Sequence, residues 1–135
     1  MRGVQRFPRE CRLLRRAEFE AVYRGGRRRA SRQFVIFYLP HDASPGAPGS
    51  VASPTRARPS RFGASVKRAL GNAVVRNRIR RRIREILRLH RQEFSAGWDI
   101  VIHPRSSVAT AAFAPLAQEL TQLIRGAVGA GANPA

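Results

Sequence analysis

Cysteine, lysine and acidic residues are scarce in this chain of 135 residues. The shortages of cysteine and of acidic residues each argue against certain classes of protein. The single cysteine, Cys11, can form no internal disulfide and no CxxC metal site, which is typical of a protein in a reducing compartment. No apolar run approaches the roughly 20 residues of a membrane-spanning helix, and the first residues include arginines but no apolar signal core. We therefore expect a cytoplasmic protein with no membrane partner.

The shortage of acidic residues has the largest consequence, because only 8 stand against 26 basic residues. The net charge is +18, so like charges destabilise the compact state unless a polyanion or counterions neutralise them. This favours a nucleic acid as the partner, although an acidic membrane surface also carries negative charge. Lys67 is the only lysine. Bidentate phosphate binding and a biased genome composition explain the excess of arginine equally well.

The acidic residues are also too dispersed to suggest phosphodiester chemistry. No DxD pair occurs, so the sequence shows no carboxylate set for two metal ions. The histidines His41, His90 and His103 are scattered, and we interpret them as core or surface residues in preference to a general acid and base pair. We expect no catalytic residue in this protein and no metal ion bound by the protein alone.

The patterns along the chain predict one α+β domain over residues 1–135, a small central sheet with packed helices. Apolar spacing predicts helices over 15–24 and 113–125, and β-branched or aromatic runs predict strands over 33–39, 60–66 and 99–103. Pro104 is expected to interrupt the ladder of the last strand. Composition predicts a flexible loop insert over 41–60 and a disordered tail over 126–135.

The segment from Arg61 to Glu93 is the most informative one, because an apolar helical stripe runs through a cluster of arginines. Asn72 is the predicted N-cap of this helix, because its side chain can accept a hydrogen bond from a free amide of the first turn. At 100° per residue, one arc of the helix contains Ile79, Ile83, Ile86, Leu87, His90 and Phe94. A ladder of arginines at i, i+4 spacing follows one flank of this arc: Arg76, Arg80, Arg84 and Arg88. Only Glu85 and Glu93 can offset this charge locally, so a phosphate surface is favoured over a merely solvated face.

The same segment resembles the bacterial ribonuclease P protein family. The match consists of Arg61, Gly63, Ser65, Val66 and Arg68, then Gly71, Asn72, Ala73 and Val74, then Arg76, Asn77, Arg78, Ile79, Arg80, Arg81 and Arg84. Residues 12–26, 32–39 and 98–105 follow the order and spacing of the family, so the resemblance covers roughly three quarters of the chain. The sequence departs from the family pattern at Ala69, where many relatives are basic, and at His103 and Pro104, which replace an apolar and a small residue.

The resemblance implies a fold and a function. The fold is similar to the second domain of ribosomal protein S5, with an unusual left-handed βαβ crossover through the basic helix. The function implied is that of the protein subunit of ribonuclease P, an endonuclease whose RNA subunit holds the catalytic Mg²⁺ and removes the 5′ leader of precursor tRNA. The implied partners are that RNA and precursor tRNA, bound by a monomeric protein in a one-to-one ribonucleoprotein.

The resemblance also implies two sets of binding residues. The first set is expected to bind the RNA subunit: Arg68, Asn72, Arg76, Asn77, Arg78, Arg80, Arg81 and Arg84. The second set is expected to bind the leader: Phe19, Tyr23, Phe37, Ser65 and Lys67. The spacing of Phe19 and Tyr23 alone favours core positions, whereas the resemblance places them in a cleft. Two alternatives stay open, a basic RNA-binding protein such as a ribosomal protein, and a nuclease that uses its own histidines.

Overall fold

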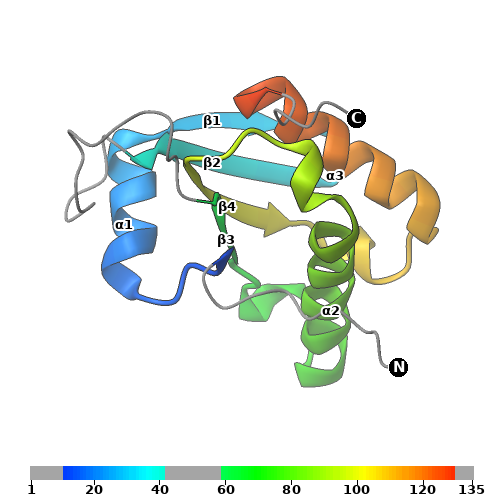
Figure 1. The fold of residues 1–135 in the computed structure, drawn as a ribbon. Helices are drawn as coiled ribbons and strands as arrows, with labels where there is room; N and C mark the ends of the chain where they lie inside the picture. Colours follow the sequence, from blue (N-terminus) through cyan, green and yellow to red (C-terminus); the bar gives the residue numbers. More distant parts are fainter. Residues whose placement is uncertain (1–10, 42–58, 130–135) are drawn as a thin grey trace, which may run out of the picture.

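The computed structural model describes residues 11–41 and 59–129 and forms a four-stranded sheet with three α-helices (Figure 1). The strands are β1 (Arg27–Ala30), β2 (Phe34–Pro40), β3 (Arg61–Ala64) and β4 (Trp98–Pro104). The helices are α1 (Arg16–Gly25), α2 (Ala73–His90) and α3 (Phe113–Val128), and short 3₁₀ turns occupy Arg68–Leu70, Arg91–Glu93 and Ser106–Ala109.

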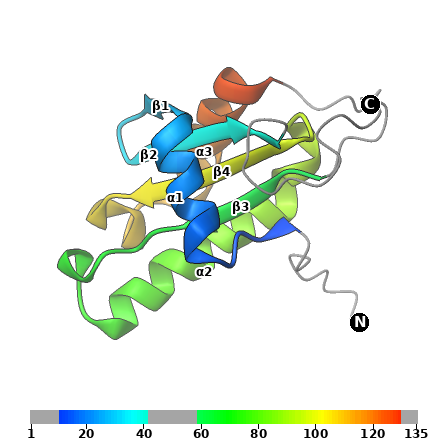
Figure 2. The ribbon, with the colours of Figure 1, turned by 90° about the vertical axis from the view of Figure 1, so that its left-hand side faces the viewer.

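The sheet is mixed, with the strand order β1-β2-β4-β3. The pairs β1–β2 and β2–β4 are antiparallel, and β3 pairs with β4 in parallel through the crossover helix α2. In Figure 2 both parallel strands point to the left, β4 lies above β3, and α2 passes behind them, which makes the crossover left-handed. The expectation of a left-handed βαβ unit, against the usual right-handed preference, is therefore confirmed.

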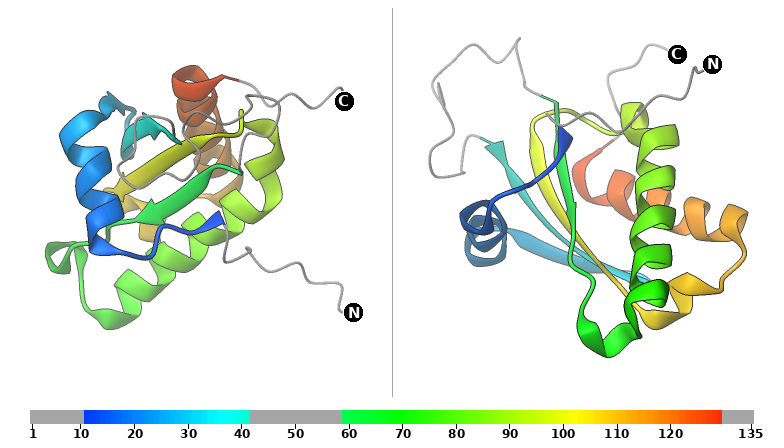
Figure 3. Two further views of the ribbon diagram at one scale, coloured as in Figure 1. Left: turned by 60° about the vertical axis from the view of Figure 1, so that its left-hand side comes forward. Right: turned by 90° about the horizontal axis from the view of Figure 1, so that it is seen from below.

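Helices cover both faces of the sheet, α1 on one side and α2 with α3 on the other (Figure 3). Alternate residues of β2 serve the two layers, because side chains of a strand point to opposite faces. Phe34 and Ile36 are fully buried under α2 and α3, whereas Leu39 packs in the smaller cluster under α1 with Val22 and Val101. The continuous apolar run of this strand is explained by burial on both sides.

Helix α2 forms where its local signals predict it. The Oδ1 atom of Asn72 accepts a hydrogen bond from the amide of Val75 at 2.9 Å, which satisfies one free donor of the first turn. Gly71 precedes this cap with a φ of 151°, a conformation that side chains disfavour. The buried residues of the helix are those of the predicted stripe, Ile79, Ile83, Ile86 and Leu87.

Strand β1 is absent from the sequence prediction. Its residues read Arg-Arg-Arg-Ala and all four are exposed, so no alternation of apolar and polar residues marks it. It forms because its backbone pairs with β2, from Arg27 opposite Tyr38 to Ala30 opposite Val35. Charged side chains on an edge strand discourage its pairing with a strand of another molecule. The arginines of β1 can have this effect at the edge of the sheet.

Pro104 does not end β4, which was expected to stop at residue 103, because Pro104 lies opposite Phe34 in the ladder with β2. The next amide, Arg105, donates to the carbonyl of Gln33 at 2.9 Å. On the other side of β4, the amide of Ser65 donates to the carbonyl of Ile102 at 2.9 Å. The next hydrogen bond of this parallel ladder would run from an amide at position 104 to the carbonyl of Ser65. Proline lacks that amide, so it ends only the pairing with β3.

The predicted insert and tail are both too long. His41 and Ser60, at the ends of the predicted insert over 41–60, belong to the fold, since Ser60 is buried and donates to the carbonyl of Ser95 at 2.8 Å. Residues 42–58 lie outside the described residues. Helix α3 continues through Gly126 to the buried Val128, because Val128 completes its apolar stripe. Residues 130–135 of the predicted tail lie outside the described residues.

Gly63 allows the first testable prediction. A Cβ atom at this position would lie 2.5 Å from Cζ of Phe19 and 3.1 Å from Cβ of Leu13, so Gly63→Ala forces the ring of Phe19 to move from its place against β3. We expect a loss of about 1 to 2 kcal/mol in the free energy of unfolding, measured by urea titration. Gly25→Ala is the control, because its nearest neighbour would be Leu39 at 3.4 Å, and equal stabilities of the two variants would contradict the prediction.

Candidate nucleic-acid interface

The arginines of α2 point in different directions around the helix, and only some are free to bind a partner. Arg78, Arg81 and Arg84 are exposed, and none has an ion pair or hydrogen bond within the described residues. Arg80 and Arg84 line one wall of a pocket next to β3. Arg76 is half-buried and donates from Nε to the carbonyl of Gly71 at 3.1 Å, so it also stabilises the turn before the helix.

Two further arginines of α2 have structural partners. Arg82 donates from Nη1 to the carbonyls of Val108 and Ala109 at 3.0 and 3.1 Å, and its guanidinium lies 5.8 Å from the ring centre of Phe113. Arg88, the last member of the predicted ladder, forms a bidentate pair with Glu85 at 3.0 and 2.7 Å. The ladder therefore presents Arg80 and Arg84 as its accessible part, with Arg76 partly engaged.

The predicted RNA contacts before and beside the ladder are exposed. Arg68 lies in the 3₁₀ turn that leads into α2, and Asn72 is the cap whose Oδ1 is already used. The Oδ1 of Asn77 accepts from Nη1 of Arg80 at 3.2 Å. Asn77, which lies between Arg76 and Arg78, therefore orients the guanidinium of Arg80.

Four of the five predicted leader-binding residues gather around His103. The hydroxyl of Tyr23 shares a 2.8 Å hydrogen bond with Nε2 of His103. The ring centres of Tyr23, Phe37 and His103 lie 5.2 to 5.5 Å from one another in edge-to-face arrangements. The positive charge of Lys67 reaches His103, and Ser65 hydrogen-bonds Tyr23. Figure 2 shows that α1 crosses in front of the strands and leaves this end of β4 uncovered.

The environment of this cluster shifts two pKa values. Burial lowers the pKa of His103, and the nearby charge of Lys67 lowers it further, so both favour the neutral form of the imidazole. Burial raises the pKa of Tyr23, and the hydrogen bond with Ser65 partly offsets this. The cluster is therefore a set of neutral aromatic rings beside one cation, which is a surface suited to unpaired bases and a phosphate.

Phe19 has a different position from the other predicted leader-binding residues. Its ring packs over Gly63 and lines the pocket shared with Arg80 and Arg84, and it is half-buried. Phe19 thus contacts β3 and the pocket beside it, whereas Tyr23 contacts Phe37 and His103. That both rings bind the leader stays a prediction. His103 was missed as a site residue, although alternation along β4 could have placed it on the face of Val101.

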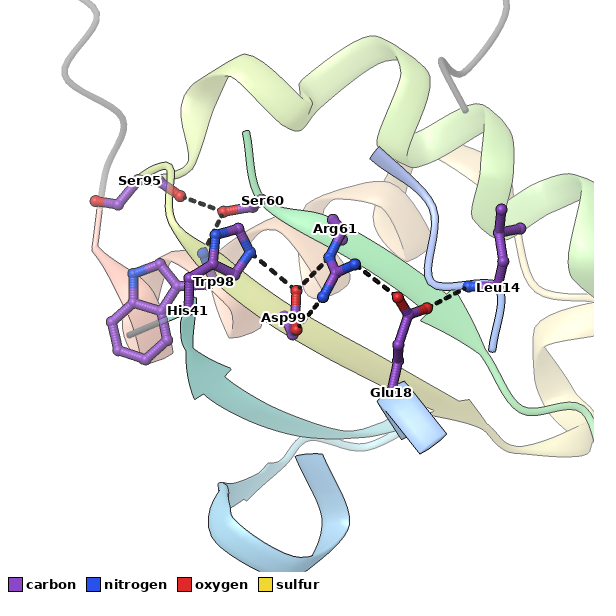
Figure 4. A network of polar contacts seen from close by, with 8 residues as sticks. All are labelled: Leu14, Glu18, His41, Ser60, Arg61, Ser95, Trp98 and Asp99. Atoms are coloured by element: carbon purple, nitrogen blue, oxygen red, sulfur yellow. Dashed lines mark hydrogen bonds and ion pairs between the residues drawn. The ribbon is translucent and has the colours of Figure 1, made fainter. Parts of the chain in front are cut away.

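The other two histidines contact carboxylate groups elsewhere in the structure. His41 donates from Nε2 to Oδ1 of Asp99 at 2.9 Å, and Asp99 also accepts two bonds from Arg61 at 2.8 and 2.7 Å (Figure 4). His90 Nδ1 lies 2.6 Å from Oε2 of Glu93 on the opposite layer. His41 and His103 lie beside opposite ends of β4, so the structure assembles no histidine pair from these residues.

The network around Asp99 ties α1 to the sheet. Arg61 extends it by donating from Nη1 to Oε2 of Glu18 at 2.8 Å, and Glu18 accepts from the amide of Leu14 at 2.9 Å (Figure 4). Burial would raise the pKa of Asp99, but the hydrogen bonds and charges of His41 and Arg61 outweigh it and hold this pKa below its usual range. This network fixes the lead-in to α1 against β3 and thereby shapes the pocket beside Phe19.

Two searches of the described residues bear on other classes of protein. No group of three or more His, Cys, Asp or Glu side chains comes together there in a way that could hold a metal ion. In the same residues, every helix is too short or too polar to cross a membrane.

Comparisons with known proteins agree with this arrangement. The family model described as Ribonuclease P matches residues 7–128. The ribonuclease P protein component of Desulfovibrio desulfuricans is 42% identical over 120 residues, covering 87% of this chain and 83% of the relative. That of Streptomyces avermitilis is 38% identical, covering 93% and 98%. The solved ribonuclease P protein of Thermotoga maritima superposes with a TM-score of 0.69 at 26% identity, covering 85% of this chain and 96% of that one. The chain therefore belongs to the ribonuclease P protein family.

Proposed function

We propose that this protein binds the catalytic RNA of ribonuclease P through the exposed arginines of α2 and binds the leader of precursor tRNA at the Tyr23 cluster. The observation that supports this most is a set of exposed arginines that have no partner among residues 11–41 and 59–129: Arg78, Arg81 and Arg84, on a chain of net charge +18. The Tyr23 cluster supplies the second surface, on the face of the sheet that α1 leaves open.

The physical contribution of the protein follows from these two surfaces. Two RNA molecules repel each other through their phosphates. The basic side chains of the two surfaces, the arginines of α2 and Lys67, lower that repulsion and release counterions. Stacking of unpaired bases on Tyr23, Phe37 and His103 holds the leader, at about 1 to 3 kcal/mol for each base. Bond cleavage is assigned to the RNA subunit and its Mg²⁺, and the protein is assigned a supporting role in a one-to-one complex in the cytoplasm.

A reconstitution assay tests the proposed function. Purified protein and precursor tRNA are combined at low magnesium with and without the bacterial catalytic RNA. We expect cleavage at the 5′ end of the tRNA only when both subunits are present. Absence of stimulation would indicate a general basic RNA-binding protein, and cleavage by the protein alone would indicate a nuclease with its own catalytic groups.

The different positions of Phe19 and Tyr23 give a second test. Tyr23 is 39% exposed, so Tyr23→Ala is expected to leave the melting temperature nearly unchanged and to weaken holoenzyme binding of leader-bearing tRNA by about tenfold. Phe19 is half-buried over Gly63, so Phe19→Ala is expected to lower stability by about 2 kcal/mol. Mature tRNA, which lacks the leader, serves as the control substrate, and equal losses for both substrates with Tyr23→Ala would refute the leader site.

A further inference from the structure

A slot lies along the open edge of β3, between the residues that lead into α1 and one side of α2. Its volume is about 210 Å³. Strand β3 is the last strand of the sheet, so β4 pairs with only one of its edges. The walls are mostly apolar and include Leu13, Phe19, Phe62, Ala64 and Leu87. The slot is therefore a small apolar recess that reaches the surface next to the RNA-binding helix.

The edge of β3 contributes backbone polar groups to this slot. Consecutive residues of a strand direct their N–H and C=O groups to opposite sides, and the amide of Ser65 points to β4, where it bonds Ile102. The N–H and C=O of Ala64 therefore point to the open edge. Leu13 bonds the carbonyl of Phe62 at 2.9 Å and so occupies the edge up to that residue. Ala64 presents one donor and one acceptor side by side.

The rim of the slot is positively charged. Arg12, Arg80 and Arg84 line it, and no acidic residue does so within the described residues. Asn77 holds the guanidinium of Arg80 by a hydrogen bond. These features match the parts of a nucleotide. The apolar walls suit the faces of a base, the backbone donor and acceptor suit its polar edge, and the arginines at the rim suit the phosphate.

We propose that this slot takes one unstacked nucleobase of the catalytic RNA. The base lies against the apolar walls and Phe19, its edge hydrogen-bonds the N–H and C=O of Ala64, and the adjoining phosphates contact Arg80 and Arg84. This inference rests on the proposed function, because it assigns one nucleotide of the same RNA to a specific pocket.

Two other occupants fit the slot less well. An extended peptide would add a strand to β3, but the strand ends at Ala64, and Leu13 already occupies its open edge at Phe62. Only Ala64 is left to pair with such a peptide. The tRNA leader is assigned to the Tyr23 cluster over the sheet face, whereas Arg80 and Arg84 belong to α2. The slot opens beside that helix, which favours the RNA subunit.

Nuclear magnetic resonance of the full ¹⁵N-labelled chain tests the base site directly. The protein is titrated with adenosine 5′-monophosphate and, as control, with ribose 5-phosphate, which has the phosphate but no base. We expect saturable shifts of the Ala64 and Leu13 amides with the nucleotide only. Equal shifts with both ligands, or none at Ala64, would overturn the proposal and show that the arginines bind phosphate alone.

A variant that fills the slot tests its use by RNA. Ala64→Leu adds apolar volume inside the slot and removes no charge, and Ala114→Leu makes the same change on the exposed start of α3. We expect Ala64→Leu alone to weaken affinity for the catalytic RNA by about tenfold with an unchanged salt dependence. Unchanged affinity, or a loss seen only for leader-bearing tRNA, would contradict the assignment.

The outcomes separate this inference from the proposed function. If Ala64→Leu binds and stimulates the RNA subunit like the wild type, the slot assignment fails while the proposed function stands. If the wild-type protein gives no stimulation, the proposed function fails whatever the nucleotide titration shows. A thermal melt accompanies each variant, and if Ala64→Leu melts several degrees lower, the wild-type titration alone decides.

Discussion

Replacing Arg78, Arg81 and Arg84 with glutamine is expected to lower affinity for the catalytic RNA by about a hundredfold. These side chains are exposed and have no partner within the described residues, so their loss removes phosphate contacts at roughly 1 kcal/mol each without loosening the fold. The slope of log affinity against log salt should fall in magnitude by roughly 2 to 3, since each neutralised phosphate contributes about 0.7 to 0.9. Filter binding over a range of salt concentrations measures both quantities.

The matched control removes the same charge from elsewhere on the molecule. Arg27 and Arg28 lie on the exposed edge strand β1, at the end of the sheet opposite β3, and Arg105 is also exposed. Their replacement with glutamine should reduce affinity only slightly. Equal losses for the two triple variants would mean that RNA responds to net charge rather than to the α2 surface.

The second large effect is expected at Asp99, whose side chain is nearly inaccessible to water. Asp99→Asn leaves Arg61 and His41 facing a neutral amide, and breaking a buried ionic group of this kind costs about 3 kcal/mol or more in the free energy of unfolding. Glu20→Gln is the control, because its pair with Arg16 is exposed and contributes under about 0.5 kcal/mol. Urea unfolding at pH 7 compares the two, and similar losses would contradict this account.

The pH dependence of stability follows from the same site. The pKa of Asp99 in the folded state lies below the 3.8 of an unperturbed aspartate. Its contribution to stability is therefore complete above that value and is lost as the pH falls through the lower folded pKa. The pKa values of Glu18 and Glu119 are lowered as well, so the wild type should lose stability in acid. The difference between wild type and Asp99→Asn is expected to shrink below about pH 4, and a constant difference would rule out the ionised carboxylate as its source.

The Asp99 network helps to shape the slot beside β3, so a change at Asp99 is expected to affect RNA binding as well as stability. Arg61 joins Asp99 to Glu18, and Glu18 fixes the amide of Leu14 in the wall of the slot. A destabilised Asp99→Asn protein that still folds at low temperature should therefore show weaker RNA binding than its surface charge predicts. The arginine variants, by contrast, should change binding and leave the melting temperature in place.

The sequence by itself determined the features that depend on neighbours along the chain. The cap at Asn72, the buried stripe of α2 and the apolar residues of α3 follow from spacing and from local hydrogen bonds, and the structure confirms them. The sheet strands with apolar runs were found for the same reason. The left-handed crossover was predicted from the family motif. Spacing alone would have predicted the usual right-handed crossover.

Only the tertiary structure decided which of these residues can act together. Arg82 and Arg78 are one helical turn apart, yet Arg82 binds carbonyls 26 and 27 residues away, while Arg78 is exposed and has no partner in the described part of the chain. Tyr23 contacts His103 across 80 residues, and the ring of Phe19 packs against Gly63. The strand β1 and the role of Pro104 likewise depend on which strand lies alongside. Contacts of this kind depend on how distant segments of the chain pack together, and they cannot be predicted from the spacing of neighbouring residues.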